Sequence, residues 1–276
     1  MGSSKMSTDW MHRAPTAGKL ERFEAFISGH GYDMHRHDTY AIGRTLSGVQ
    51  SFQYRGQERH SLPGRTIVLH PDEPHDGQAG TDDGFQYRML YVEPSLIQQI
   101  LGGKPLPFVK NGISADPRLF AATDALLQGM DSTVDALEEA DAMFDLAHAL
   151  HKVSGVSHSK QSFDYRAAEK AREFIHSAID STVTLDALAA HSGRDRWSLS
   201  RDFRCLFGTS PYRYLTMRRL DVVRAMLMQG QSLVDAALAA GFVDQSHMTR
   251  HFSKTYGMSP SRWQKMQRLG SAAVAG

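Results

Sequence analysis

The chain of 276 residues contains a single cysteine, Cys205. A lone cysteine excludes an intrachain disulfide framework and fits the reducing cytoplasm. The sequence also lacks any run of 18 apolar residues, and its first ten residues, MGSSKMSTDW, lack the apolar core of a secretion signal. These absences predict a soluble cytoplasmic protein that does not span a membrane.

A strong overall charge is missing as well, because 31 Lys and Arg oppose 30 Asp and Glu, a net of +1. This balance conceals two halves of opposite sign. Residues 1–159 carry 14 basic and 20 acidic side chains (14 − 20 = −6), and residues 160–276 carry 17 and 10 (17 − 10 = +7). An acidic half joined to a basic half predicts two domains, the second of which faces a polyanion.

The acidic half begins with β-type sequence and continues with helical sequence. From about residue 19 to residue 91, the runs YAIGRTL, QSFQY, RTIVLH and YRMLYV are separated by Gly, Pro and Asp, a spacing typical of a sandwich or small barrel. Helices are predicted over 116–129 and 133–152, where apolar side chains recur at helical spacing. The following segment, SGVSHSKQS (154–162), has one large apolar residue and predicts an interdomain linker.

The basic half is predicted to be helical throughout. A first helix is expected over 165–179. A second begins after Thr184 as N-cap and ends at Gly193, and a third ends at Gly208. Pro211 then starts a longer helix that runs to about residue 229, since proline in the first helical turn loses no hydrogen bond.

One sequence frame occurs twice in this half. RDFRCLFGTSPYR starts at Arg201 and RHFSKTYGMSPSR at Arg250, an offset of 49 residues (250 − 201). Each copy predicts a short helix, a tight turn, a second helix, a glycine stop and a Ser-Pro restart, which is a helix-turn-helix. ALAA precedes the turn in both copies, at 187–190 and 237–240. The residues expected to be buried are Leu188, Leu199 and Phe203 in the first copy and Leu238, Met248 and Phe252 in the second.

A helical repeat without nucleic acid is the alternative, but the charge of +7 and the polar second helices favour DNA. Residues 165–269 resemble the DNA-binding domain of the AraC/XylS family of bacterial transcription regulators. The resemblance rests on L-A-A-x-x-G (188–193), L-S-R-x-F (199–203), G-x-S-P (208–211 and 257–260), A-x-x-x-G-F (237–242), D-Q-S-H (244–247) and T-R-x-F (249–252).

This resemblance implies that double-stranded DNA is the partner and that the exposed face of each second helix reads it. The implied base-reading residues are Arg196, Trp197, Ser200, Arg201, Gln245, Ser246, His247 and Arg250. Arg201 and Arg250 are the best candidates for guanine, because a guanidinium can bond O6 and N7 together. Six further basic residues are candidates for phosphate contacts: Arg204, Arg213, Arg218, Arg219, Lys254 and Arg262.

The acidic half contains G-x5-H-x-H from Gly29 to His37, and PDEPH at 71–75. This pattern resembles a cupin barrel, in which metal-binding members combine three histidines with a glutamate. His35, His37 and His75 match the histidines, but the glutamate position falls on Ala41 or Ile42. We therefore expect no stoichiometric metal and no cofactor, although three histidines can bind Zn²⁺.

HRHDTYAIGRTLSG, PGRTIVLHPDEPHDG and YRMLY, within residues 19–94, resemble the AraC-type ligand-sensing barrel, which holds a small effector. The candidate effector-binding residues are His35, His37, Tyr40, Arg44, His70, His75, Arg88 and Tyr91. Strand alternation forbids that all of them face inward together. An anionic or amino-acid-like effector is expected, with Arg44 and Arg88 as partners of a carboxylate.

The sequence thus predicts an α+β protein: a cupin-like β-barrel with following helices, then an all-α domain with two helix-turn-helix units. The expected boundaries are a tail (1–18), the barrel (19–105), a helical dimerisation segment (106–153), a linker (154–164) and the DNA-binding domain (165–276). The predicted function is that of an effector-responsive transcription regulator and not of an enzyme. The protein is expected to form a homodimer, with RNA polymerase as a possible further partner. The alternatives are a DNA binder with a vestigial barrel and a cupin metalloenzyme fused to a DNA-binding domain.

Overall fold

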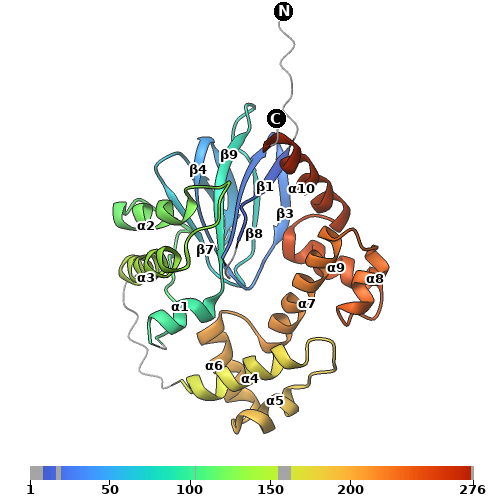
Figure 1. The fold of residues 1–276 in the computed structure, drawn as a ribbon. Coiled ribbons are helices and arrows are strands. Elements are labelled where there is room, and N and C mark those ends of the chain that lie inside the picture. The colour runs from blue at the N-terminus through green and yellow to red at the C-terminus, as the bar shows by residue number, and fades with distance from the viewer. Residues whose placement is uncertain (1–8, 17–19, 103, 155–162, 275–276) are drawn as a thin grey trace, which may run out of the picture.

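The computed structural model describes residues 9–16, 20–102, 104–154 and 163–274. Its N-terminal part contains two antiparallel sheets, and its C-terminal part is helical (Figure 1). The strands are β1 (Trp10–Arg13), β2 (Glu21–Ile27), β3 (His30–His35), β4 (Tyr40–Gly48), β5 (Gln50–Tyr54), β6 (Gln57–Ser61), β7 (Thr66–Leu69), β8 (His75–Ala79), β9 (Phe85–Val92) and β10 (Ile113–Ser114).

The two sheets are separate, with strand orders β1-β2-β9-β4-β7-β10 and β3-β8-β5-β6. The predicted barrel is therefore a cupin-like pair of sheets that does not close completely. Strand β1 pairs in register with β2, from Trp10 opposite Phe26 to Arg13 opposite Phe23. The prediction that residues 1–18 are only a tail is wrong for this strand, because its pairing adds a strand to the first sheet.

Strand β9 shows how the first sheet separates two environments. Phe85, Tyr87 and Met89 point between the sheets, whereas Leu90 and Val92 belong to a second core beneath three helices. These helices are α1 (Pro94–Ile100), α2 (Pro117–Leu127) and α3 (Ala136–Val153), and they cover one side of the sheet (Figure 1). Alternate side chains of a strand face opposite sides, so one strand contributes to both cores.

The remaining helices are α4 (Tyr165–Ser177), α5 (Leu185–Ser192), α6 (Arg196–Phe207), α7 (Pro211–Met228), α8 (Leu233–Ala239), α9 (Gln245–Tyr256) and α10 (Pro260–Val274). The boundaries predicted at Thr184, Gly193, Gly208 and Pro211 are confirmed. Most residues of the predicted linker, 155–162, lie outside the described residues. Within the described residues, no helix is both long and apolar enough to cross a membrane.

The repeat is confirmed as two helix-turn-helix units, α5–α6 and α8–α9, joined by α7 (Figure 1). Five of the six predicted core positions are buried, but Leu238 is 57% exposed. The N-caps Thr184 and Ser232 are 48 residues apart, whereas the ALAA letters suggest 50. Two residues rotate a helix by about 200°, so the counterpart of Leu188 is the buried Ala236.

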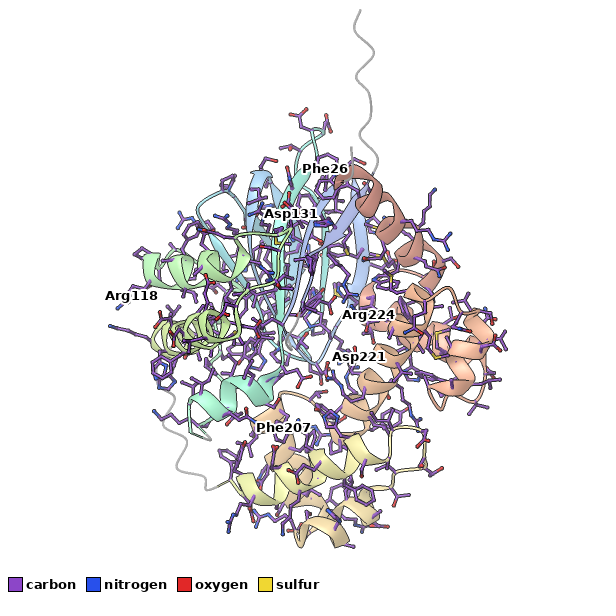
Figure 2. The ribbon with its side chains drawn as sticks, in the orientation of Figure 1. Phe26, Arg118, Asp131, Phe207, Asp221 and Arg224 are labelled. Atoms are coloured by element: carbon purple, nitrogen blue, oxygen red, sulfur yellow. The ribbon has the colours of Figure 1, made fainter. Side chains whose placement is uncertain are left out.

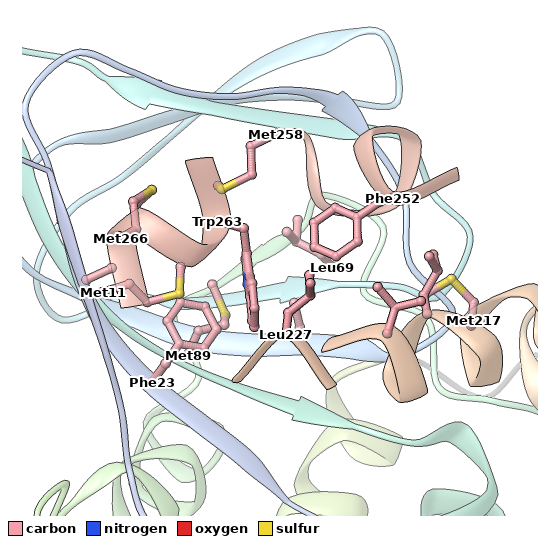
Figure 3. Packing of buried hydrophobic residues seen from close by; sticks show 14 of the residues in the cluster. Met11, Phe23, Leu69, Met89, Met217, Leu227, Phe252, Met258, Trp263 and Met266 are labelled. Atoms are coloured by element: carbon pink, nitrogen blue, oxygen red, sulfur yellow. The ribbon is translucent and has the colours of Figure 1, made fainter. Parts of the chain in front are cut away.

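The two units contribute to different cores. The first unit shares a separate core with α4 and α7, which contains Leu199 and Phe203. The second unit and α10 join the core between the sheets. Figure 3 shows Trp263 and Met266 of α10 beside Met11 and Met89 of the strands. The second unit therefore shares a hydrophobic core with the sheets, and the first unit has a core of its own.

Candidate DNA-binding helices and effector cavity

Helix α6 is the predicted reading helix of the first unit. Asp195 caps its start, and Arg196, Trp197 and Arg201 are exposed, with 75% of Trp197 open to solvent. The prediction that Ser200 lies on the exposed face is wrong, because it is 9% exposed and its hydroxyl accepts a hydrogen bond from Arg204.

Helix α9 is the corresponding helix of the second unit. Asp244 caps its start, as Asp195 caps α6. Gln245, Ser246 and Arg250 are exposed, and His247 is half-buried with its Nε2 3.0 Å from Nε2 of His251. The two predicted guanine readers, Arg201 and Arg250, thus both lie on the solvent side of their helices.

A small cavity of about 50 Å³ lies between the sheets and the second unit. Of the eight candidate effector residues, His35, His37, His75 and Tyr91 line it. Its apolar wall includes Phe23 and Met89 on the strands and Trp263 on α10 (Figure 3).

The other four candidate effector residues lie elsewhere, and their placement in the barrel interior is wrong. Arg44 pairs with Asp124 of α2 at 2.5 Å, and Arg88 donates to Glu24 and to the carbonyl of Leu127. Both arginines occupy strand positions whose side chains point toward the helices, opposite to the cavity.

The two candidate ring side chains, Tyr40 and His70, also lie outside the cavity. Tyr40 belongs to the core beneath the helices and donates its hydroxyl to the carbonyl of Pro107. The ring of His70 packs against Tyr40 and Phe108. Whether a strand residue faces the cavity or the helices depends on its place in the alternation along the strand. The sequence did not assign that place to each residue.

Sequence reasoning missed the residues that the helical domain contributes to the cavity. Arg224 of α7 enters it, together with Tyr256 at the end of α9, and pairs with Glu21 of β2. Figure 2 shows Arg224 and Asp221 between α7 and the sheets. Burial opposes ionisation of Glu21, but Arg224 and Arg13 outweigh it and lower the pKa of Glu21. No local sequence motif signals this contact, because its two sides are 203 residues apart (224 − 21).

A larger cavity of about 320 Å³ adjoins the first and shares Glu21, Tyr91 and Arg224 with it. Arg218 of α7 lines this cavity and donates to Glu93 at 2.8 Å and to Asp38 at 3.1 Å.

Other predicted phosphate contacts are also engaged within the chain. Arg213 pairs with Asp72 at 2.8 Å, and Arg262 with Asp9 at 3.4 Å. Arg219 donates to the carbonyls of residues 179 and 181. In this conformation the assignment of Arg213, Arg218 and Arg262 to DNA phosphates is wrong, because the acidic sheet domain neutralises them. The acidic half of the same chain thus supplies part of the negative charge that the basic domain faces.

His35, His37 and His75 converge in the first cavity, where one ring nitrogen from each lies within 4.8 Å of the others. Burial lowers the pKa of His35 to about 3, and nearby His37 acts in the same direction. Burial likewise lowers the pKa of His37 to about 3, with His75 adding to the shift. All three imidazoles are therefore neutral at pH 7, which is the form that ligates metals.

Comparison with known proteins agrees with both halves of the structure. Residues 17–147 match the AraC-like ligand binding domain, and residues 188–266 match a helix-turn-helix domain. The HTH-type transcriptional regulator YbfI of Bacillus subtilis is 26% identical over 222 residues, covering 78% of this chain and 80% of that protein. The regulatory protein PchR of Pseudomonas aeruginosa is 27% identical over 216 residues, covering 70% and 72%.

Among solved structures, ToxT of Vibrio cholerae has the same fold, with a TM-score of 0.66 at 13% identity over 91% of this chain and 99% of that one. A second ToxT structure, with an unsaturated fatty acid bound, gives 0.64 at 11% identity over 96% and 98%. A sheet domain with an internal cavity, followed by a duplicated helix-turn-helix, defines a ligand-responsive DNA-binding regulator. The chain belongs to the AraC family of transcription regulators.

Proposed function

We propose that this regulator changes its hold on DNA when a small molecule binds between the sheets and the second helix-turn-helix unit. The observation that carries this proposal is the position of Arg224. It belongs to the DNA-binding domain, yet it is 8% exposed and lines the cavity of the sheet domain. A ligand that binds there contacts both domains, and its affinity must therefore differ between docked and undocked states.

The proposed effector is a small carboxylic acid with an apolar body. Arg224 can exchange Glu21 for a ligand carboxylate, and its buried Nε has no hydrogen-bond partner within the described residues. The aromatic and methionine wall suits an apolar body. The unsaturated fatty acid bound to ToxT is an acid of this kind. A volume of about 50 Å³ is too small for such a ligand, so we propose that it extends into the adjoining 320 Å³ cavity.

A thermal-shift screen of carboxylic acids tests the effector proposal. The best ligand is then titrated by calorimetry into wild type, Arg224→Gln and Arg88→Gln, with DNA binding measured in parallel. Arg88 is the matched control, because it also pairs with a strand glutamate but points to the opposite side of the sheet. We expect Arg224→Gln to weaken ligand binding at least tenfold and Arg88→Gln to leave it unchanged. Equal binding by all three proteins would contradict the proposal.

We further propose that the exposed faces of α6 and α9 read DNA, through Arg196, Trp197 and Arg201 and through Gln245, Ser246, His247 and Arg250. The protein then acts in the cytoplasm as a regulator and not as a catalyst, with RNA polymerase as a further partner. A vestigial sensing domain remains the alternative. It is favoured if no screened compound alters both the melting temperature and the DNA affinity.

We also propose that α3 pairs two copies of the chain. Leu137 and Phe144 are 72% and 53% exposed and lie seven residues apart, on one side of the helix. Phe144→Glu should convert a dimer to a monomer in analytical ultracentrifugation. Leu238→Glu, an exposed leucine on α8, is the control and should leave the dimer intact. A monomeric wild-type protein would contradict this arrangement.

A further inference from the structure

We propose that His35, His37 and His75 bind one divalent transition-metal ion of the Zn²⁺ type. Strands β3 and β8 place His35 directly opposite His75, and His37 follows two residues later in the chain. The ring centroids of His35 and His75 are 4.3 Å apart, and those of His37 and His75 are 4.9 Å apart. Three imidazoles thus converge from one pair of strands and the loop that follows.

The separation of the ring nitrogens suits a metal after a small adjustment. They lie within 4.8 Å of one another. Zn–N bonds of about 2.0–2.1 Å place tetrahedral ligands roughly 3.4 Å apart. Side-chain movements of at most about 1.4 Å (4.8 − 3.4) close this difference.

Hydrogen bonds to the backbone orient all three rings for ligation. His35 donates Nδ1–H to the carbonyl of Asp33 at 2.9 Å, and His75 donates to that of Glu73 at 2.9 Å. His37 donates to the carbonyl of Thr39 at 2.8 Å. A carbonyl only accepts hydrogen bonds, so each Nδ1 carries the proton and each Nε2 carries the lone pair.

This arrangement matches that of metal-bound histidines, whose second nitrogen almost always donates to a carbonyl, carboxylate or water. The Nε2 of His37 gives independent support, because it is buried, the residue is 4% exposed, and this atom has no hydrogen-bond partner within the described residues. Buried polar atoms are rarely left unpaired. A metal ion would satisfy this lone pair.

The glutamate of metal-binding cupins is missing here, and for that reason we expected no metal. In this geometry its absence would instead leave one coordination position of the metal open. Ala41 lines the same cavity where a glutamate would supply a fourth ligand. Three neutral imidazoles would leave a bound metal its full double positive charge and an open coordination position. That position suits water or an oxygen atom of an anionic ligand.

The site also touches the second helix-turn-helix unit. The carbonyl of Asp33 accepts from His35, and the amide of the same Asp33 donates to the carbonyl of Gly257 at 3.0 Å. Gly257 ends α9. A metal that fixes the His35 ring therefore also orders the contact between the sheet domain and the end of a DNA-reading helix.

Calorimetric titration of the chelator-treated full-length protein with Zn²⁺, alongside Co²⁺ absorption spectra, tests the site. Wild type should bind one ion per chain, gain thermal stability and give a Co²⁺ spectrum typical of tetrahedral nitrogen ligation. His37→Ala and His75→Ala should weaken binding by more than ~100-fold, beyond the roughly 10–100-fold loss of an outer-sphere partner.

Two control variants separate this site from other causes. His70→Ala should bind like wild type, because His70 is half-buried and donates Nδ1–H to the carbonyl of Pro71 but lies outside the cluster. His247→Ala removes one member of the surface pair with His251. Loss of binding only in His247→Ala, or no stoichiometric binding by wild type, overturns the proposal. Retained metal binding by Arg224→Gln would show that the metal site stands independently of the effector proposal.

Discussion

The two helix-turn-helix units share a frame but are held differently. In both, an aspartate caps the second helix and a glycine with positive φ ends it, Gly208 at 75° and Gly257 at 64°. A Cβ on either glycine would lie closer than 3.0 Å to the sheet domain, next to Pro71 or to the carbonyl oxygen of Asp33. The repeated glycine thus permits both the helix end and the close approach of the two domains.

Beyond these glycines the contacts diverge. The second unit and α10 share a hydrophobic core with the sheets, and the first unit does not. The connecting helix α7 pairs Arg218 and Arg224 with acidic residues of the sheet domain. A duplicated sequence therefore yields one unit coupled to the sensor domain and another with an independent core.

The largest expected effect comes from Arg218→Met. This change leaves the buried carboxylate of Asp38 without its guanidinium partner, which costs about 3–5 kcal/mol. We expect a lower melting temperature and faster proteolysis of α8–α10. Arg201→Met in the first unit is the matched control and should cost under about 1 kcal/mol, since Arg201 is exposed and Arg194 also pairs with Asp202. If both variants lowered the melting temperature equally, the proposed difference in how the two units are held would be contradicted.

Loss of a predicted guanine contact should be the next largest effect. Arg201→Ala and Arg250→Ala should each weaken specific DNA binding by about 1–3 kcal/mol and relax sequence preference at one half of the site. Binding-site selection with each variant measures this, and the two affected positions should lie about one helical turn apart. If affinity for random DNA falls equally, both arginines contact only phosphates.

Alanine at either repeated glycine should cost at least about 1–2 kcal/mol, because a non-glycine residue is strained in the left-handed region. Gly257→Ala should cost more than Gly208→Ala. Its Cβ would lie 2.6 Å from a backbone oxygen in a paired strand, whereas that of Gly208 meets the side chain of Pro71. Chemical denaturation of both variants tests this order, and a larger loss in Gly208→Ala would contradict it.

The smallest effect concerns pH. Burial raises the pKa of Asp38 to about 7, against the influence of Arg218 and with that of Asp221 and Glu93. An unfolded aspartate has a pKa near 3.9. The folded protein therefore holds more protons between about pH 4 and pH 7, and this group's contribution to the free energy of unfolding declines as pH rises through that range. The melting temperature of wild type minus that of Asp38→Asn should fall from pH 5 to pH 7.5. A constant difference would mean that Asp38 is ionised throughout.

The sequence alone determined much of this protein, wherever the cause is local. The N-caps, glycine stops and Pro211 specify helix ends through nearest-neighbour hydrogen bonding, and strand alternation predicts that only some candidates face inward. The resemblance to cupins likewise implied that His35, His37 and His75 converge, as the structure shows. Leu238 was misassigned because identical letters do not guarantee identical helical phase.

Only the tertiary structure decided which residues form the site between the domains. Arg44 and Arg88 are polar residues in apolar strands, but α2 supplies their partners, whereas Arg224 comes from a helix far along the chain. Charge composition predicted that the basic half faces a polyanion, but it did not predict that acidic residues of the same chain pair with Arg213, Arg218 and Arg262. Burial and pairing depend on how separate elements pack, and that packing is a property of the whole fold rather than of any short segment.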